Sequence, residues 1–352
     1  MPLRLEKRAE RSSTMALVSP LIAIALTLIF GAAVFASRGV DPWHGLYVYF
    51  VEPLTDEWAR EKMIVKATPL ILMGAGLALA YRANVWNIGA AGQLQIGALF
   101  TGLIPVYFSN WQDPSVMPAM LLMGVIGGIL WALIPAYLKV RFNANEILTS
   151  LMMVYIADLV FDWLVRGPMR DPQGHNFPKT VNFVGWQTLP HWGDIHLGAL
   201  FALVVALGLG FMTYRMLKGF ELLTLGSAPR AGRFAGFSAQ RAIYFCFALS
   251  GGLAGLAGAS DVMGVSHQLQ TPYSTPAYGF VAIIVAFLGR LNPIGAIFSG
   301  LLLALTFLGG EAAQTSLHIP DKIAKVFQGV LLFFVLACDT LVYYRVKWES
   351  RK

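Results

Sequence analysis

The chain has 352 residues, of which 57% are hydrophobic and 13% are charged, and its formal net charge is +7. Soluble domains contain about a quarter charged residues, so this composition excludes an ordinary soluble protein and indicates a polytopic membrane protein. The basic residues lie in short gaps between apolar runs, which argues against a nucleic-acid-binding surface and is typical of membrane topology signals.

Residues 1–16 form a basic tail ahead of the first apolar run. That run is too long for a signal peptide and has no clear cleavage site, so we expect a retained membrane span preceded by a cytoplasmic tail. The two cysteines, Cys246 and Cys338, lie in apolar segments and indicate neither a disulfide nor a metal site.

About ten segments are apolar and long enough to cross a bilayer, since a span needs about 20 apolar residues and fewer within a bundle. They cover approximately residues 17–36, 63–81, 88–108, 116–138, 146–165, 196–214, 242–261, 277–289, 294–310 and 321–343. With both termini in the cytoplasm, most of the 26 Lys and Arg residues fall on the cytoplasmic side. The positive-inside rule therefore predicts an all-α helix bundle, N-in and C-in, in a bacterial inner membrane, with residues 1–352 as a single transmembrane domain.

Residues 166–195 form a long outer segment that is rich in Pro, Gly, Asn, His and Trp. We expect this segment to form an ordered external cap over the pathway. The histidines of the region, His175, His191 and His196, lack the tight spacing and the companion Cys or carboxylate of a zinc site. They are therefore interpreted as interfacial or solvated residues, and no metal is predicted.

A basic loop over residues 215–241 separates two apolar blocks and carries five basic residues against the single acid Glu221. A connection of this length with its own helical pattern is typical of a segment that binds a partner. Within it, Ser227 is the predicted N-cap of a short helix and Pro229 lies in the first turn. Gly236 is expected to end this helix, which we expect to dock onto a cytoplasmic partner.

Two regions depart from ordinary spans. The third segment opens with glycines and with the amides of Asn87, Gln93 and Gln95, and residues 289–293 separate the short eighth and ninth segments. Interrupted helices in both halves of a transporter indicate a site near the bilayer midplane, because the freed backbone groups must face protein or water. Small residues also allow helices to pack closely, and the glycines leave that alternative open.

Sequence motifs for catalysis or nucleotide binding are missing from the chain. It contains no G-x-x-x-x-G-K-[ST] loop for phosphate, so we expect it not to bind ATP in the usual way. It also has no G-x-S-x-G or H-E-x-x-H motif. The sequence therefore predicts no enzymatic activity and no cofactor, and a membrane-embedded enzyme is the weakest alternative.

Several ionisable residues lie in or near the predicted spans, namely Lys66, Glu146, Asp158, Asp162, Glu311 and Lys325. Each costs about 2.5–3.5 kcal/mol at the centre of a helix on insertion scales, so the central ones should face a cavity or a partner. Glu146 is explained more simply by the helix dipole at the start of its segment. Asp158 and Asp162 share a helix face, and the sequence does not decide between a substrate vestibule and the membrane boundary.

Four segments, taken in order, resemble the permease subunits of ABC importers. They read WNIGAAGQ (86–93), NEILTSLMMVYIA (145–157), TLGSAPRAGRFAGFS (224–238) and GFVAIIVAFLGRLNPIGAIFSGLLLA (279–304). The branch that is most similar takes up nucleosides and simple sugars and is related to the branched-chain amino acid and ribose permeases. The chain departs from the family pattern at Ala91, where an acid is common, and at Val154, where Asn is usual.

This resemblance implies a set of partners. Two permease chains, identical or homologous, line one pathway in the lipid bilayer, cytoplasmic ABC ATPases dock on the coupling helices, and an external substrate-binding protein delivers the solute. The residues implied in ATPase coupling are Gly226, Pro229, Arg230, Arg233, Phe234 and Gly236. Among these, the two arginines would meet acidic rims on the ATPase and Phe234 would fill its groove.

We therefore predict a permease subunit that moves a nucleoside-like solute with energy from a separate ATPase, without a nucleic-acid partner. Alternatives are a simple-sugar ABC permease and, from a different class, an ion-coupled secondary transporter or channel, although no spaced ion relay is present. The predicted substrate-pathway residues are Asn87, Gln93, Gln95, Asn145, Glu146 and Glu311. Amides and few charges suit a hydroxylated, uncharged solute that needs orienting hydrogen bonds.

Overall fold

The computed structural model describes residues 3–7, 13–174, 177–273, 277–320 and 322–348, so the predicted loop histidine His175 lies outside the described residues. The chain divides into two compact units. Unit 1 comprises Met1–Arg60 with Leu305–Lys352, and unit 2 comprises Glu61–Ala304. Two helices, α4 (Glu57–Arg82) and α13 (Gly295–Leu317), begin in one unit and end in the other.

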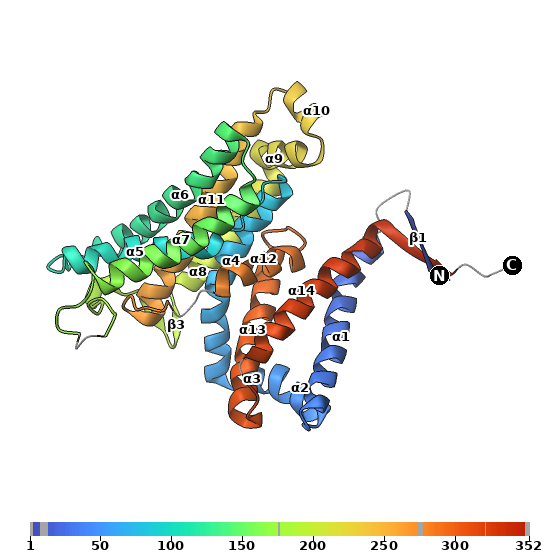
Figure 1. Ribbon diagram of the computed structural model, residues 1–352, viewed down its shortest axis with the longest axis horizontal. Coiled ribbons are helices and arrows are strands. Elements are labelled where there is room, and N and C mark those ends of the chain that lie inside the picture. The colour runs from blue at the N-terminus through green and yellow to red at the C-terminus, as the bar shows by residue number, and fades with distance from the viewer. Residues whose placement is uncertain (1–2, 8–12, 175–176, 274–276, 321, 349–352) are drawn as a thin grey trace. The chain divides into compact units, whose positions relative to one another are not determined.

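Unit 1 is made of the N-terminal and C-terminal helices (Figure 1). Its own elements are β1 (Leu3–Lys7), α1 (Ser13–Ser37), α2 (Pro42–Phe50), α3 (Glu52–Thr55), α14 (Lys322–Tyr343) and β4 (Tyr344–Trp348). The helices α1 and α14 pack along each other, and β1 pairs antiparallel with β4 beyond their ends. The first and last described segments of the chain therefore lie together.

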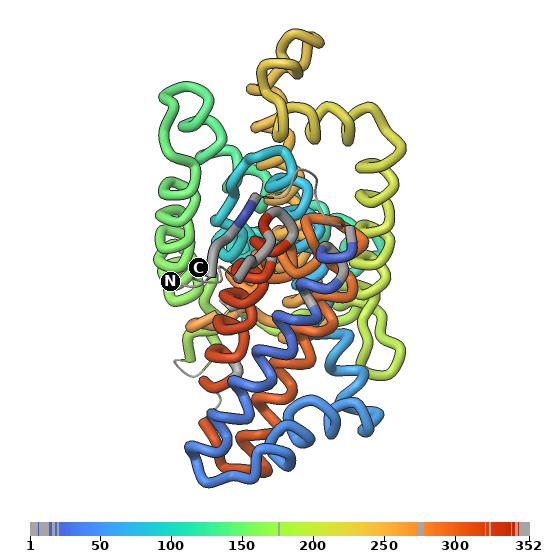
Figure 2. Tube along the Cα trace, turned by 90° about the vertical axis from the view of Figure 1, so that its right-hand side faces the viewer, coloured from blue at the N-terminus to red at the C-terminus, as the bar shows by residue number. Residues whose placement is uncertain are grey.

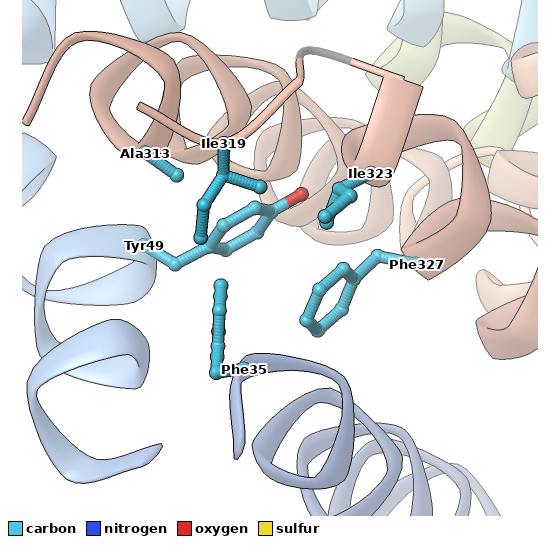
Figure 3. Packing of buried hydrophobic residues seen from close by; sticks show 6 residues of the cluster. All are labelled: Phe35, Tyr49, Ala313, Ile319, Ile323 and Phe327. Carbon is cyan, nitrogen blue, oxygen red and sulfur yellow. The ribbon is translucent and has the colours of Figure 1, made fainter. Parts of the chain in front are cut away.

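An aromatic cluster forms the core of unit 1 (Figure 3). Tyr49 of α2 lies at its centre and stacks on Phe327 of α14, with ring centroids 4.6 Å apart. Phe35 of α1 packs against both rings at 6.3 and 5.8 Å. The Tyr49 hydroxyl donates a hydrogen bond of 2.8 Å to the carbonyl of Thr306, so its single polar group is satisfied inside the cluster.

Unit 2 contains the remaining helices. They are α5 (Ala90–Tyr107), α6 (Val116–Phe142), α7 (Glu146–Arg166), α8 (Gly198–Arg215), α9 (Leu217–Ser227), α10 (Pro229–Phe234), α11 (Ala239–Asp261) and α12 (Ala277–Leu288). Short elements follow α7 and α11, namely η1 (Gly185–Gln187), β2 (His191–Trp192), β3 (Ile195–His196) and the π-helical turn η2 (Val262–Ser266). The central contacts are those of α11 with α5 and α6.

Backbone meets backbone where α5, α6 and α11 cross. A Cβ atom added to Gly255 of α11 would lie 2.1 Å from the carbonyl oxygen of Gly124 in α6. A Cβ on Gly97 of α5 would lie 2.3 Å from the Cα of Gly255. Helices approach this closely only where side chains are absent, as small residues allow in membrane bundles. The glycines of this region therefore set the spacing of the three helices.

The predicted spans agree with the observed helices. Each of the ten predicted segments coincides with one of α1, α4, α5, α6, α7, α8, α11, α12, α13 and α14. Within the described residues, six helices are long and apolar enough to cross a membrane, and three shorter apolar helices accompany them. A multi-pass helical membrane protein is thus confirmed, whereas ten crossings and N-in/C-in termini stay predictions.

The sequence did not predict the four short strands. In β1 and β4 apolar and charged residues alternate, as in Leu3, Arg4 and Leu5, and this pattern of period two favours an extended strand. Each strand has at most five residues, so the signal was too short to stand out beside the long apolar runs.

The glycine crossing can be tested by Gly255→Ala. The added methyl group would meet the backbone oxygen of Gly124, which has no rotamer by which to move away, so we expect unfolding to become easier by about 3 kcal/mol. The matched control is Gly208→Ala in α8, where no described atom lies within 4 Å of the added Cβ. The midpoint of thermal unfolding in detergent should fall strongly for Gly255→Ala and stay unchanged for Gly208→Ala. Equal midpoints in the two variants would contradict the role of the crossing.

Candidate functional site

Asn87 and Gln93 form a reciprocal pair of amides at the start of α5. The Asn87 Nδ2 donates to Gln93 Oε1 at 2.9 Å, and the Gln93 Nε2 donates back to Asn87 Oδ1 at 3.0 Å. Asn87 also donates to Ser250 Oγ of α11 at 2.9 Å and accepts from the backbone N–H of Gly89 at 3.0 Å. Both side chains are buried and fully hydrogen-bonded, so the pair ties the α4–α5 connection to α11. Their place in the solute pathway stays a prediction.

Gln95 lies two residues further along α5 and differs from this pair. Its Nε2 donates to the Asp158 Oδ1 of α7 at 2.5 Å. Its Oε1 is buried and has no hydrogen-bond partner among the residues that the structure describes. Asp158 is exposed on α7. The structure thus joins Gln95, a predicted pathway residue, to the acid whose role the sequence left open.

The other predicted pathway residues are spread out. Asn145 is the N-cap of α7, where its Oδ1 accepts from the N–H of Ile147 at 3.0 Å. Glu146 forms an ion pair of 2.8 Å with Lys139 at the end of α6. Glu311 lies on α13 in unit 1, whereas the other five residues belong to unit 2. A shared site for all six residues is therefore not formed within unit 2.

The predicted short helix is α10, and Gly236 ends it as expected. Gly236 has a φ of +84°, and its N–H donates to the Arg233 carbonyl at 3.0 Å. The N–H of Phe237 donates to the Gly232 carbonyl at 3.0 Å, which completes a Schellman motif. Pro229 lies in the first turn, as predicted, and is the first helical residue.

The predicted N-cap of this helix was wrong. Ser227 is the last residue of α9, and its hydroxyl donates back to the Leu223 carbonyl at 2.8 Å. Ala228 is the N-cap of α10 and has no side chain with which to cap it. A serine near a helix end can bond in either direction, and here the preceding helix continues far enough to capture it.

The surface of α10 is almost wholly exposed. Phe234 is 98% exposed, and Arg230 and Arg233 beside it are also exposed, whereas Gly232 packs on Leu225 of α9. The helix is attached to the bundle through α9, since a Cβ on Gly226 would lie 2.2 Å from the Arg82 carbonyl at the end of α4. An exposed aromatic and two arginines are thus held on a rigidly anchored helix.

The segment 166–195, for which an external cap is predicted, is ordered where it is described, and it is bonded to the segment that follows α11. The backbone bonds join Thr180 N to Leu269 O (2.9 Å), Phe183 N to His267 O (2.7 Å), Leu189 N to Met263 O (3.0 Å) and Thr271 N to Pro178 O (3.1 Å). The cap lies at one end of unit 2 and α9 and α10 at the opposite end, in both views (Figures 1 and 2). The cap segment and α10 are therefore separated by the length of the helices of unit 2.

Three histidines gather where the cap meets the end of α11. The ring of His191 lies 6.2 Å from that of His196 and 5.9 Å from that of His267. Burial first, and then the nearby His191 and His267, lower the pKa of His196 to about 4. Burial likewise lowers the pKa of His267. In the described part of the chain no group of three or more His, Cys, Asp or Glu is arranged to hold a metal.

Two residues of this region, Asp261 and His267, were not predicted from the sequence. Asp261, at the end of α11, is buried and accepts a hydrogen bond of 3.0 Å from the Tyr273 hydroxyl. His267 joins the histidine group although it is far from the cap in the sequence. Asp261 could have been noticed in the sequence as an acid at the end of an apolar run. No sequence pattern marked His267, because its partner His191 belongs to the distant segment between α7 and α8.

A family model described as "Branched-chain amino acid transport system / permease component" matches residues 60–336. The chain is 32% identical to the glucose ABC transporter permease protein TsgB13 of Haloferax volcanii, over 98% of this chain and 93% of that protein. It is 28% identical to the guanosine ABC transporter permease protein NupP of Bacillus subtilis, over 95% and 97% of the two chains. It is 25% identical to the nucleoside ABC transporter permease protein NupB of Lactococcus lactis subsp. cremoris, over 92% of each.

The amide pair is tested by Asn87→Ala. Truncation leaves the buried amide of Gln93 and the N–H of Gly89 without their partner, and each such group costs about 1–3 kcal/mol. We expect a clear loss of thermal stability in detergent, and little loss for the exposed control Asn110→Ala. The double variant Asn87→Ala with Gln93→Ala should cost less than the sum of the two single changes. Additive losses would contradict the reciprocal pair.

The histidine group predicts that stability depends on pH. The folded protein holds His196 neutral, with a pKa of about 4, whereas the unfolded chain protonates it near pH 6.5. The stabilisation is therefore complete above about pH 6.5 and is lost as the pH falls towards 4, by about 3 kcal/mol. Between pH 7.5 and 4.5, the midpoint of thermal unfolding should change less with pH in His196→Gln than in the exposed control His44→Gln. Parallel slopes would contradict the assignment.

Proposed function

This chain belongs to the family of permease components of branched-chain amino acid transport systems and is a membrane permease of an ABC importer, and we propose that its solute is nucleoside-like. It is a transport subunit rather than a catalytic one. The observation that carries the proposal for its mechanism is α10, whose Phe234 is 98% exposed between two exposed arginines.

The partner proposed for α10 is a cytoplasmic ABC ATPase. Binding energy at protein interfaces is concentrated in a few aromatic and Arg residues that become desolvated. Phe234 supplies such an anchor, and Arg230 and Arg233 supply charges for an acidic rim. Pro229 and Gly236 delimit the helix so that this face is presented as one rigid turn.

Movement of the ATPase would reach the bundle through α9 and α11. Gly226 places the end of α9 against the end of α4, and Gly219 places its start against the end of α8, where a Cβ would lie 2.4 Å from the Thr213 carbonyl. Contacts this close do not deform gradually, so the helices attached to α10 would move together. ATP drives such a change only if the ATPase binds α10 with different affinity in the two states.

The family to which the chain belongs supports the remaining partners. We propose a second permease subunit, homologous or identical, and an external substrate-binding protein that meets the cap over residues 166–195. The chain would have about ten crossings with both termini inside a bacterial inner membrane, and residues 1–352 would act as a single permease domain. The basic residues near α10 support this orientation, because Arg and Lys favour the cytoplasmic side.

Support for a nucleoside-like solute comes from two sides. Two of the relatives above are named for guanosine and nucleosides, and a third is named for glucose. The candidate pathway offers amides and one exposed acid, which suit a neutral hydroxylated solute. A simple sugar is the second candidate, because TsgB13 is named for glucose and has the highest identity of the three.

An ion-coupled secondary transporter is the alternative from another class. Proteoliposomes that hold this chain alone would then accumulate solute with an ion gradient and without ATP. We expect no such uptake, and we expect uptake to require the ATPase, ATP and the binding protein together.

The coupling contact is tested by Phe234→Ala. Loss of the exposed anchor should weaken association with the ATPase by about 2 kcal/mol or more, which is about 30-fold, while leaving the thermal stability of the permease unchanged. The matched control is Phe177→Ala, an exposed phenylalanine in the cap at the other end of unit 2. Association is measured by binding of purified ATPase to immobilised permease complex. Unchanged binding of Phe234→Ala, or labelling that places α10 outside the cell, would contradict the proposed contact.

A further inference from the structure

We propose that Gln95 and Asp158 form a solute-binding site that accepts hydrogen bonds from two hydroxyl groups on neighbouring carbons of the solute. This inference rests on the proposed function, since it names the chemistry that the permease recognises. It assigns to Asp158 a role that the sequence left open, and it separates Gln95 from the two other amides at the start of α5.

The first observation is the incomplete bonding of Gln95. Its side chain is 1% exposed, yet its Oε1 has no partner among the described residues. The orientation of the amide follows from chemistry, because only the Nε2 can donate to the Asp158 Oδ1 at 2.5 Å and the Oε1 would repel it. Most buried polar groups are hydrogen-bonded, so an unpaired carbonyl oxygen beside a carboxylate indicates a bond that a further group must supply.

The second observation is the position of Asp158. It lies on a helix that is long and apolar enough to cross a membrane, and its side chain is exposed on the same face as Tyr155, which is 57% exposed. A carboxylate is strongly disfavoured in lipid, so such residues face a water-filled cavity or a partner. In the described ranges only the Oδ1 of Asp158 is hydrogen-bonded, which leaves the Oδ2 able to accept.

These two free oxygens define the kind of ligand. One hydrogen bond joins the side chains of Gln95 and Asp158, so each remaining acceptor belongs to a group that takes part in that bond. Both acceptors require donors, and hydroxyls on neighbouring carbons supply two donors from one solute. The 2′- and 3′-hydroxyls of a ribonucleoside and the ring hydroxyls of a hexose share this feature. An anionic solute would instead meet repulsion from Asp158.

Asp162 lies one turn further along α7 and is not part of the proposed site. The single N–H of the Arg166 Nε is shared between the two carboxylate oxygens of Asp162, at 2.8 and 2.9 Å, and the Thr271 hydroxyl donates a further bond to its Oδ1. Its acceptors are therefore engaged in holding the end of α7 to the segment after α11. The two acids share a helix face in the sequence, but Asp158 is the one with an unpaired buried oxygen beside it.

The site is tested by cysteine protection in the complete importer, reconstituted in proteoliposomes with its ATPase, second permease and binding protein. The reporter is Tyr155→Cys, which leaves Gln95 and Asp158 intact, and the probe is a water-soluble methanethiosulfonate reagent. Background labelling is measured in the parent complex, where Cys246 and Cys338 are both buried. The solutes compared are adenosine, 2′-deoxyadenosine, which has no hydroxyls on neighbouring ribose carbons, and glucose.

We expect the reagent to label the reporter and a solute with adjacent hydroxyls to protect it. Loss of one hydroxyl, or the change Asp158→Asn, should raise the half-protecting concentration about 10- to 100-fold, as for a hydrogen bond to a charged group. The matched control Asp162→Asn should leave that concentration unchanged. Protection by adenosine at lower concentration than by glucose identifies a nucleoside as the source of the hydroxyls, and the reverse order identifies a sugar.

Three results would overturn the site: a reporter that the reagent does not label, labelling that none of the solutes slows, and protection that is equal for adenosine and 2′-deoxyadenosine or unchanged in Asp158→Asn. ATP-driven uptake of labelled adenosine and glucose is measured on the same vesicles. Uptake without the expected protection refutes this site alone, whereas protection without any ATP-driven uptake refutes the proposed function.

Discussion

The close crossing of α5, α6 and α11 is the contact on which the arrangement of unit 2 depends. At Gly97, Gly124 and Gly255 the backbones are so near that a single methyl group on any of them has no space. Water is absent from a bilayer interior, so tight van der Waals packing replaces the hydrophobic effect as the force between helices. This crossing holds α5 in register with its neighbours, and the polar residues at the start of α5 are thereby placed against α7 and α11.

The amides of α5 show how one helix serves two purposes. Asn87 and Gln93 satisfy each other, and together they hold the turn before α5. Gln95 instead contacts Asp158 and keeps one buried oxygen unpaired. A fully bonded pair stabilises a fixed structure, whereas an incompletely bonded pair remains available to a ligand. The distinction between support and recognition is therefore made by hydrogen bonding rather than by residue type.

The two ends of unit 2 differ in how firmly their surface segments are packed against the bundle. At one end the cap is bonded to the segment after α11 through its backbone, and His196 is kept neutral by burial. At the other end α10 contributes almost nothing to packing except Gly232. Between them the glycine contacts make the bundle stiff. We therefore expect a displacement at α10 to be transmitted by whole helices to the polar groups, rather than absorbed locally.

The sequence by itself determined the positions of the long helices, because each long apolar run predicts a membrane-spanning helix. It likewise determined the limits of α10, because Pro229 and Gly236 favour the start and the end of a helix through their backbone geometry. It also determined the family, through motifs spread along the chain. The tertiary structure decided which polar residues meet. Gln95 and Asp158 are 63 residues apart, and His267 reaches His191 from beyond α11. Ser227 bonds back into α9 because that helix continues to it. Local patterns fix the conformation of a segment, whereas the pairing of distant side chains depends on how helices cross, and in this chain glycines that look alike in sequence set those crossings.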